Sequence, residues 1–299
     1  MKLVIGLLAL ASAVTISACS APPDAGGIPR KGAPKAAGAG TDDGAGPTGE
    51  PSGGPTTRDA GPVTGEPDGG DAGGAPAAKS SKGAGGPTGQ NELKSTGGLS
   101  YIINVPTTAA TKPRGLLVLL HGSTASNYRE FIAMMATVAT AQDLIRVSVL
   151  APNGQGWNEG DQTTGAGLLD KLLKQDLFTK YDINLSRIVF SGQSSGGGFL
   201  SSYFLPLHAK DFAGGAFMQC GAAPPVPTFA PDAATKADFR LHFEITTGDP
   251  IWPASYKSAV AAYTAAGMTL TKDDTKPGGH CAFDQQAVIQ AHIATILPP

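Results

Sequence analysis

The sequence predicts an α/β fold with a mostly parallel sheet and helices on both faces. Over residues 91–299, short apolar runs typical of buried strands alternate with longer segments of helical spacing. Because a helix that follows a strand returns the chain to the same edge of the sheet, this alternation favours parallel strand pairs. The uninterrupted apolar run Leu116–Leu120 supports the prediction, since strands of a parallel sheet are covered on both faces.

The expected elements follow one another in a regular order. We expect strands at 101–105, 116–120, 147–150, 188–190, 214–219, 241–245 and 268–270. We expect helices at 128–141, 166–178, 255–266 and 285–296, and a further helix around 199–204. A region of this length suffices for one hydrophobic core but is too short for an additional large cap domain. Sheets of this kind bind ligands beyond the carboxyl ends of their strands, so candidate site residues are sought there.

The first 18 residues are typical of a targeting segment. Lys2 supplies a positive charge, and the apolar stretch 3–16 is too short to span a bilayer stably. The segment ends in Ile-Ser-Ala before Cys19, which resembles a bacterial lipobox. The resemblance implies that residues 1–18 are a lipoprotein signal peptide, that cleavage occurs before Cys19 and that Cys19 is acylated. An ordinary secretory signal with an incidental cysteine is the alternative.

Acylation would fix the mature chain to the envelope of a bacterium. Several acyl chains anchor a protein durably without a spanning helix, so the membrane becomes a partner through the lipid anchor. Ser20 rather than aspartate follows Cys19, which is compatible with transfer to the outer membrane of a Gram-negative envelope. We therefore expect a lipid-anchored cell-envelope protein, at the outer membrane or the cell surface.

Residues 19–90 are predicted to form the lipidated cysteine and a disordered tether. Glycine and proline crowd into this part of the chain, and large apolar side chains are almost absent from it. Such a segment buries too little apolar surface to offset the entropy of ordering. As a flexible coil, residues 20–90 would span roughly 40–50 Å. The net charge of −2 and the lack of a basic block exclude nucleic acid as a partner.

The central motif of the folded region is Gly-Gln-Ser-Ser-Gly at 192–196, between a predicted strand and a predicted helix. Strand, G-x-S-x-G turn and helix together are typical of the nucleophile elbow of α/β-hydrolases. The turn is so sharp that the residues two before and two after the nucleophile nearly touch, so both must be small. Ser194 meets this requirement through Gly192 and Gly196, whereas Ser195 would place a glutamine at the crowded position. We therefore expect Ser194 to be the nucleophile.

Two backbone amides are candidates for an oxyanion hole. The N–H of Ser195 follows the nucleophile directly, and the N–H of Ser123 lies in the loop after strand 116–120, where this fold takes its second donor. His121 in the same loop precedes the nucleophile, whereas the expected chain order is Ser, acid, His. We expect it to hold the loop through side-chain hydrogen bonds.

Asp249 is the expected catalytic acid. It follows the strand at 241–245 behind a glycine, at the carboxyl end where the site is expected. Three other aspartates are less suitable. Asp238 precedes this strand and lies at its wrong end, whereas Asp273 and Asp274 follow the last strand and suit surface turns.

His280 is the expected base, because two glycines precede it and the final predicted helix follows it. The glycines leave room for the ring to reach the nucleophile. The other histidines fit less well: His208 lies in a polar stretch, His242 inside a strand and His292 inside the last helix.

Ser194, Asp249 and His280 thus occur in the chain order that an acyl-transfer triad requires on this fold. In such a triad the histidine takes the serine proton, and the aspartate fixes the histidine tautomer. This chemistry requires no metal and no organic cofactor. The sequence contains no cluster of His, Cys and Asp with metal-ligand spacing, so we expect neither.

With these residues placed, the folded region resembles the secreted esterases grouped as polyhydroxybutyrate depolymerase-like and feruloyl esterase-like enzymes. The resemblance covers nearly all of residues 91–299 and none of the tether. The matching positions are His121-Gly122, Pro152-Asn153-Gly154, Trp157-Asn158, Tyr181-Asp182-Ile183-Asn184 before Arg187, Gly192 to Gly196, Gly248-Asp249 with Pro253, and Gly279-His280. The Trp-Asn pair and the Tyr-to-Arg spacing are more particular to this group than the elbow is.

The resemblance implies an α/β-hydrolase that acts as a serine carboxylic ester hydrolase on polymeric or plant-derived esters. It also implies that the loop of Trp157 and Asn158 borders the active site and that Trp157 lines the acyl or alcohol pocket. A buried packing tryptophan is the alternative. Trp252, beside Asp249, is a further candidate for substrate binding. The sequence departs from the group because it lacks an aspartate pair around 162–164 and a separate substrate-binding domain, which weighs against polymer degradation.

The remaining cysteines, Cys220 and Cys281, are expected near the rim of the site. An oxidising compartment allows a disulfide between them, which would fix the loop of His280. Two free thiols that pack as small apolar side chains are the alternative.

Two other functions remain open at this point. A serine peptidase or amidase of the same fold would need a peptide pocket, and a non-catalytic surface-binding domain would need no intact triad. Loop shape rather than fold decides the substrate. We expect the chain to be a monomer.

Overall fold

The structure, a computed structural model, describes residues 79–125 and 127–297. These residues belong to one compact unit, Gly69–Pro299. The expected signal peptide, Cys19 and the expected tether up to residue 78 lie outside the described residues. Within the described part, no helix combines the length and the apolar character that a membrane span requires.

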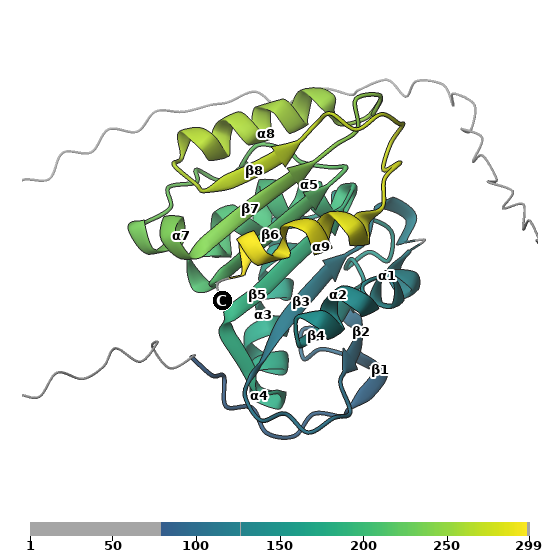
Figure 1. Cartoon of the computed structure of the whole chain (residues 1–299), viewed down its shortest axis with the longest axis vertical. Coiled ribbons are helices and arrows are strands. Elements are labelled where there is room, and N and C mark those ends of the chain that lie inside the picture. Colours follow the sequence, from purple (N-terminus) through teal and green to yellow (C-terminus); the bar gives the residue numbers. More distant parts are fainter. Residues whose placement is uncertain (1–78, 126, 298–299) are drawn as a thin grey trace, which may run out of the picture. The chain divides into compact units, whose positions relative to one another are not determined.

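In this part of the chain, eight strands form one sheet in the order β1-β2-β4-β3-β5-β6-β7-β8 (Figure 1). β1 pairs antiparallel with β2, and β2 pairs antiparallel with β4. All pairs from β4 to β8 are parallel. The strands are β1 Gly89–Lys94, β2 Ser100–Val105, β3 Arg114–Leu120, β4 Leu144–Val149, β5 Ile183–Gln193, β6 Gly214–Gln219, β7 Phe239–Glu244 and β8 Leu270–Asp273. The predicted α/β fold with a mostly parallel sheet is confirmed.

Helices cover both faces of the sheet, as predicted (Figure 1). One face packs against α1 Tyr128–Met134, α2 Ala136–Ala141 and α9 Gln285–Ile296. The other face packs against a long helical run, 162–180, that consists of α3 Gln162–Lys171, the π-helical η2 Leu172–Leu177 and α4 Phe178–Lys180. The same face carries α5 Ser195–Phe199, π-helical η3 Leu200–Phe204, α6 Leu205–His208 and α8 Pro253–Ala265. The short elements are η1 Ser123–Ala125, η4 Ala209–Asp211 and α7 Ala233–Asp238.

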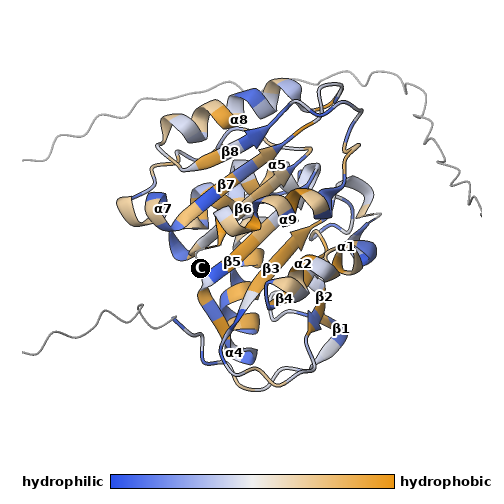
Figure 2. Ribbon diagram, viewed as in Figure 1, coloured by the Kyte–Doolittle hydropathy of each residue, from blue (hydrophilic) through white to orange (hydrophobic). Residues whose placement is uncertain are grey.

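The core follows from the alternation of side chains along buried strands. In β3 every residue is buried; Leu116, Val118 and Leu120 join the core on one face, whereas Leu117 and Leu119 join the core on the other. Figure 2 shows the central strands mostly as hydrophobic and the last strand, β8, as mostly hydrophilic. An apolar strand with both faces covered is typical of a parallel sheet, so composition alone identifies the centre of this one.

Several elements differ from the sequence predictions. β1 was not predicted, because it is a polar edge strand whose side chains alternate between half-buried and exposed. α7 was not predicted either. The expected helix 128–141 is interrupted at Met135. The expected strand 268–270 begins later, at Leu270, because the Met268 N–H donates to the Tyr263 carbonyl and so still belongs to the end of α8.

The packed part of the chain also begins earlier than the expected boundary at residue 91. Residues 79–88 form an arm along the first residues of β5 and the residues directly before it. The Ser81 N–H donates to the Ile183 carbonyl (2.9 Å), and the Leu185 N–H donates to the Lys79 carbonyl (2.8 Å). Within this arm, a Cβ on Gly83 would lie 2.5 Å from the carbonyl oxygen of Tyr181, so only glycine fits there.

The arm provides a test of this boundary. We expect Gly83→Ala to lower the free energy of unfolding by about 1–3 kcal/mol, because the added methyl group meets backbone atoms that cannot move aside. Ala84→Val, at an exposed neighbouring position, should change it by less than about 0.5 kcal/mol. Urea unfolding followed by circular dichroism measures both. Equal stability of the two variants would show that the arm is not part of the folded unit.

Candidate active site

Ser194 occupies a sharp turn between β5 and α5. Its backbone has φ 49° and ψ −113°, a strained conformation for a residue other than glycine. A Cβ on Gly192 would lie 2.4 Å from the carbonyl carbon of Gly196, and a Cβ on Gly196 would lie 2.4 Å from the Leu120 oxygen. Both flanking positions therefore admit only glycine, as the elbow motif predicts for a turn centred on Ser194.

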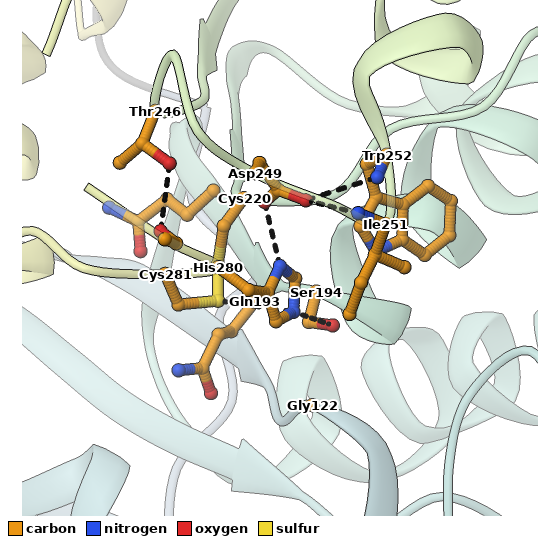
Figure 3. The surroundings of a disulfide bond; sticks show 12 residues. Gly122, Gln193, Ser194, Cys220, Thr246, Asp249, Ile251, Trp252, His280 and Cys281 are labelled. Atoms are coloured by element: carbon orange, nitrogen blue, oxygen red, sulfur yellow. Dashed lines mark hydrogen bonds and ion pairs between the residues drawn. A yellow bond between two sulfur atoms is a disulfide. The ribbon is translucent and has the colours of Figure 1, made fainter. Parts of the chain in front are cut away.

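The structure brings Ser194, His280 and Asp249 into one chain of hydrogen bonds (Figure 3). The Ser194 Oγ lies 2.8 Å from His280 Nε2, and His280 Nδ1 lies 2.7 Å from Asp249 Oδ2. An ionised carboxylate only accepts hydrogen bonds, so Nδ1 carries the ring proton and donates a hydrogen bond to Asp249. Nε2 then has a free lone pair and accepts the hydrogen bond of the Ser194 hydroxyl.

The buried Asp249 carboxylate is fully hydrogen-bonded. Its side chain is inaccessible to solvent, and its second oxygen, Oδ1, accepts hydrogen bonds from the backbone N–H groups of Ile251 (2.8 Å) and Trp252 (3.1 Å). Two of the other aspartates weighed as the catalytic acid have different partners. Asp273 binds Thr275 and Lys276, and Asp274 binds Lys272. Asp249 is thus held in place by backbone amides of the loop that it begins.

The loop that carries His280 is fastened to the loop that carries Asp249. The Gly248 N–H donates to the Gly278 carbonyl (3.1 Å), and the Thr246 hydroxyl donates to the Gly279 carbonyl (2.8 Å). A disulfide between Cys220 and Cys281, with Cα atoms 5.1 Å apart, joins the residue after His280 to the end of β6. The predicted disulfide is therefore confirmed, and Cys281 Sγ lies 3.6 Å from His280 Nε2 (Figure 3).

An ion pair with a buried carboxylate adds a further attachment that the sequence did not suggest. Glu244, at the end of β7, has a fully buried side chain, and its Oε1 lies 2.5 Å from the Lys276 ammonium group on the His280 loop. Its Oε2 lies 3.1 Å from His242 Nε2. Burial works against the charge of Lys276, but its hydrogen bonds to Glu244 and Asp273 raise the pKa of the ammonium group above its ordinary value. Lys276 therefore stays charged at neutral pH.

Ser123 and Ser195, the expected oxyanion residues, lie close to one another. The Ser123 Cα and the Ser195 Oγ lie 3.4 and 3.5 Å from the point that a Cβ on Gly156 would occupy. A Cβ on Gly122 would in turn lie 3.5 Å from the Cβ of Ser194. The Ser195 N–H belongs to the first turn of α5, where amides have no partner within the helix. The loop of Gly122 and Ser123 and the first turn of α5 thus both lie next to Ser194.

His121 is buried and binds backbone groups through both ring nitrogens. Nδ1 lies 2.6 Å from the Gly122 carbonyl, and Nε2 accepts a hydrogen bond from the Ala151 N–H (3.0 Å). Burial lowers the pKa of the imidazole, so the ring is neutral at neutral pH. The prediction that His121 holds the loop by hydrogen bonds is confirmed.

The three expected substrate-binding residues have different surroundings. Trp157 is only 2% exposed, packs on Phe199 with ring centroids 4.8 Å apart, and lines a pocket together with this phenylalanine. Asn158 is exposed, and its backbone carbonyl accepts a hydrogen bond from the side chain of Gln162. Trp252 is half-buried beside Asp249.

Two groups of side chains come close enough to hold a metal ion within the described ranges. In the first, Cys220 and Cys281 flank His280, but their sulfurs are bonded to each other. In the second, Asp170 and Asp211 lie near His208, but the Lys174 ammonium group pairs with both carboxylates at 2.7 and 2.8 Å. Neither group leaves a free set of ligands.

Comparisons with known proteins agree with this architecture. A carboxylesterase from Mesorhizobium loti superposes with a TM-score of 0.53 at 17% identity, over 69% of this chain and 98% of its own. A ferulic acid esterase superposes with a TM-score of 0.51 at 14% identity, over 69% of this chain and 96% of its own. An arylesterase gives a TM-score of 0.51 at 12% identity, over 72% of this chain and 85% of its own. The chain has the α/β-hydrolase fold.

At such low identity the likeness concerns the fold. No family model matches the sequence, and no curated protein matches it. Within the α/β-hydrolase fold, the strand order and the turn after β5 place Ser194 at the carboxyl edge of the sheet, where proteins of this fold carry their nucleophile.

The Glu244–Lys276 pair of this hydrolase fold can be tested by substitution. We expect Lys276→Met to lower the free energy of unfolding by about 3 kcal/mol, the lower end of the range for a broken buried pair, because the ammonium group is partly exposed. Lys276→Arg keeps the charge and should retain most of this stability. Guanidinium unfolding at pH 7 compares the two. If both variants unfold at the same denaturant concentration as the unchanged chain, the pair does not stabilise the loop.

Proposed function

We propose that the protein is a serine carboxylic ester hydrolase that acts through an acyl-enzyme. The observation that carries this proposal is the continuous hydrogen-bonded chain from Ser194 through His280 to Asp249 at the carboxyl edge of an α/β-hydrolase sheet. Nucleophile, base and orienting acid at hydrogen-bond distance form the arrangement that activates a serine hydroxyl.

In the proposed mechanism, His280 acts first as a base. Its free Nε2 takes the proton of Ser194 as the hydroxyl oxygen attacks the ester carbonyl, and the resulting imidazolium is stabilised by the ionised Asp249. The same imidazolium then returns the proton to the leaving alcohol. Water, deprotonated by His280 in turn, attacks the acyl group and regenerates the Ser194 hydroxyl.

The charge that develops on the carbonyl oxygen requires donors fixed in advance. We assign this role to the backbone N–H groups of Ser123 and Ser195, since both residues border the nucleophile. One such donor typically contributes about 3 kcal/mol to lowering the barrier. The helix that begins at Ser195 adds the partial positive charge of its amino end.

Two observations favour esters over other acyl substrates. Three structurally similar proteins are named as a carboxylesterase, a ferulic acid esterase and an arylesterase. The resemblance of the sequence to polyhydroxybutyrate depolymerase-like and feruloyl esterase-like enzymes points to the same bond. Amides are harder to cleave, because their leaving group must be protonated as it departs.

We expect Ser194→Ala to reduce kcat on 4-nitrophenyl acetate by about 10⁴–10⁶-fold, because the attacking atom is removed. Ser195→Ala is the matched control, since it retains the backbone N–H and removes only the neighbouring hydroxyl. It should keep activity within about tenfold of the unchanged protein. Hydrolysis is followed at 405 nm together with peptide and amide substrates. Full activity of Ser194→Ala, or cleavage of peptides without cleavage of esters, would refute the proposal.

We further propose that the enzyme is anchored in a bacterial envelope by acylation of Cys19, with the membrane as its partner. The support is the sequence Ile-Ser-Ala-Cys at 16–19 behind an apolar stretch. The glycine- and proline-rich residues that follow would separate the catalytic unit from the anchor.

Metabolic labelling with a palmitate analogue tests the anchor on the full chain in a Gram-negative host. The unchanged chain should incorporate label and sediment with membranes, whereas Cys19→Ser should do neither. Label in the Cys19→Ser chain would refute acylation at this residue.

A further inference from the structure

Ile251 is an exposed apolar side chain in an unusual position. It is 60% exposed and lies two residues after Asp249, directly before Trp252 and α8. Isolated exposed apolar residues are common and usually need no explanation. This residue differs because its backbone N–H donates to Oδ1 of Asp249 at 2.8 Å, so the carboxylate that orients His280 also fixes the position of Ile251.

The side chain lies on the nucleophile side of Asp249. Figure 3 shows Ile251 with its tip directed toward the hydroxyl of Ser194. The backbone of Ile251 is linked to Ser194 through only two intervening residues, Asp249 and His280, by hydrogen bonds of 2.8, 2.7 and 2.8 Å. The backbone that carries this apolar side chain is therefore tied to the same chain of hydrogen bonds that includes Ser194.

Trp252 extends this apolar surface. Its ring covers Gly198 on α5, where an added Cβ would lie 2.5 Å from the ring atom Cη2. The backbone N–H of Trp252 donates to the same Asp249 oxygen at 3.1 Å. Because the backbone amides of both residues donate to one Asp249 oxygen, the backbone that carries the two side chains cannot shift without disturbing the hydrogen bonds of the carboxylate.

From these contacts we infer that Ile251 is a specificity-determining residue, which contacts an apolar chain of the ester next to the scissile bond. This inference rests on the proposed function and deepens it, since it assigns esters with a hydrophobic acyl or alcohol chain as the preferred substrates. Acyl and alcohol chains of this kind share one property: their apolar surface would be removed from water by contact with Ile251.

The expected size of the effect follows from burial. A methylene group that leaves water completely improves binding about fourfold. Ile251 covers an extended chain from one side only, so the gain per methylene is smaller and accumulates over the several carbons within its reach. Substitution of the side chain leaves the N–H that binds Asp249 in place, and therefore leaves the catalytic hydrogen bonds intact.

The test compares Ile251→Ser with the unchanged protein on short and long esters. One arm varies the acyl chain with 4-nitrophenyl acetate and octanoate, and the other varies the alcohol with ethyl and octyl acetate. In one of the two arms, Ile251→Ser should lower kcat/KM for the long ester by about three- to tenfold and for the short ester by less than twofold. The arm that responds identifies the chain that Ile251 contacts.

Met134→Ser is the matched control, because Met134 is also apolar and exposed (38%) but lies on α1, which does not contribute to the site. It should leave all four values of kcat/KM unchanged. Equal effects of Ile251→Ser on short and long esters in both arms, or no effect on any, would overturn the inference while Ser194-dependent hydrolysis persists. Failure of the proposed function itself gives a different result, since no ester is then cleaved through Ser194.

Discussion

The site depends above all on the hydrogen bonds of one buried carboxylate. A carboxylate removed from water is costly unless its oxygens are bound, and both oxygens of Asp249 are bound within the protein. One oxygen orients His280, and the other accepts hydrogen bonds from two backbone amides of its own loop. The same group thus accepts the hydrogen bond of His280 Nδ1 and holds the backbone of Ile251 and Trp252. In the proposed mechanism, activation of Ser194 therefore depends on the same carboxylate that holds the backbone of Ile251 and Trp252.

The strained backbone of Ser194 requires a second kind of support, which comes from neighbouring strands. The Ser194 N–H donates to the Gln219 carbonyl at the end of β6 (2.8 Å), and its own carbonyl accepts from the Gly198 N–H (2.9 Å). A residue in an unfavourable conformation persists only where its surroundings determine it, and here the sheet and the helix do so together. The disulfide from Cys220 starts at the residue after Gln219, so the end of β6 holds both the nucleophile turn and the His280 loop.

The sequence predicted the parts of this arrangement that arise from local patterns. The buried strands are visible as apolar runs, and the elbow follows from the spacing of Gly192 and Gly196 around Ser194, because sterics alone impose it. The positions of Asp249 and His280 follow from chain order on a parallel sheet. The pairing of Glu244 with Lys276 was not predictable, because no local pattern reveals a contact between residues 32 positions apart. The surroundings of Trp157 were not predictable either, because the sequence does not indicate whether the ring of a tryptophan in a loop faces a ligand or the core.

The two ends of β5 contact different parts of the chain, and the length of the strand separates these parts. The arm at 79–88 joins the sheet beside Ile183, at the amino end of this strand, whereas Ser194 follows its carboxyl end. A strand of eleven residues extends over roughly 33–36 Å. The arm therefore lies at the edge of the sheet opposite the triad. Because parallel strands have all their carboxyl ends at one edge, this topology leaves the candidate site at the edge of the sheet opposite the arm at 79–88.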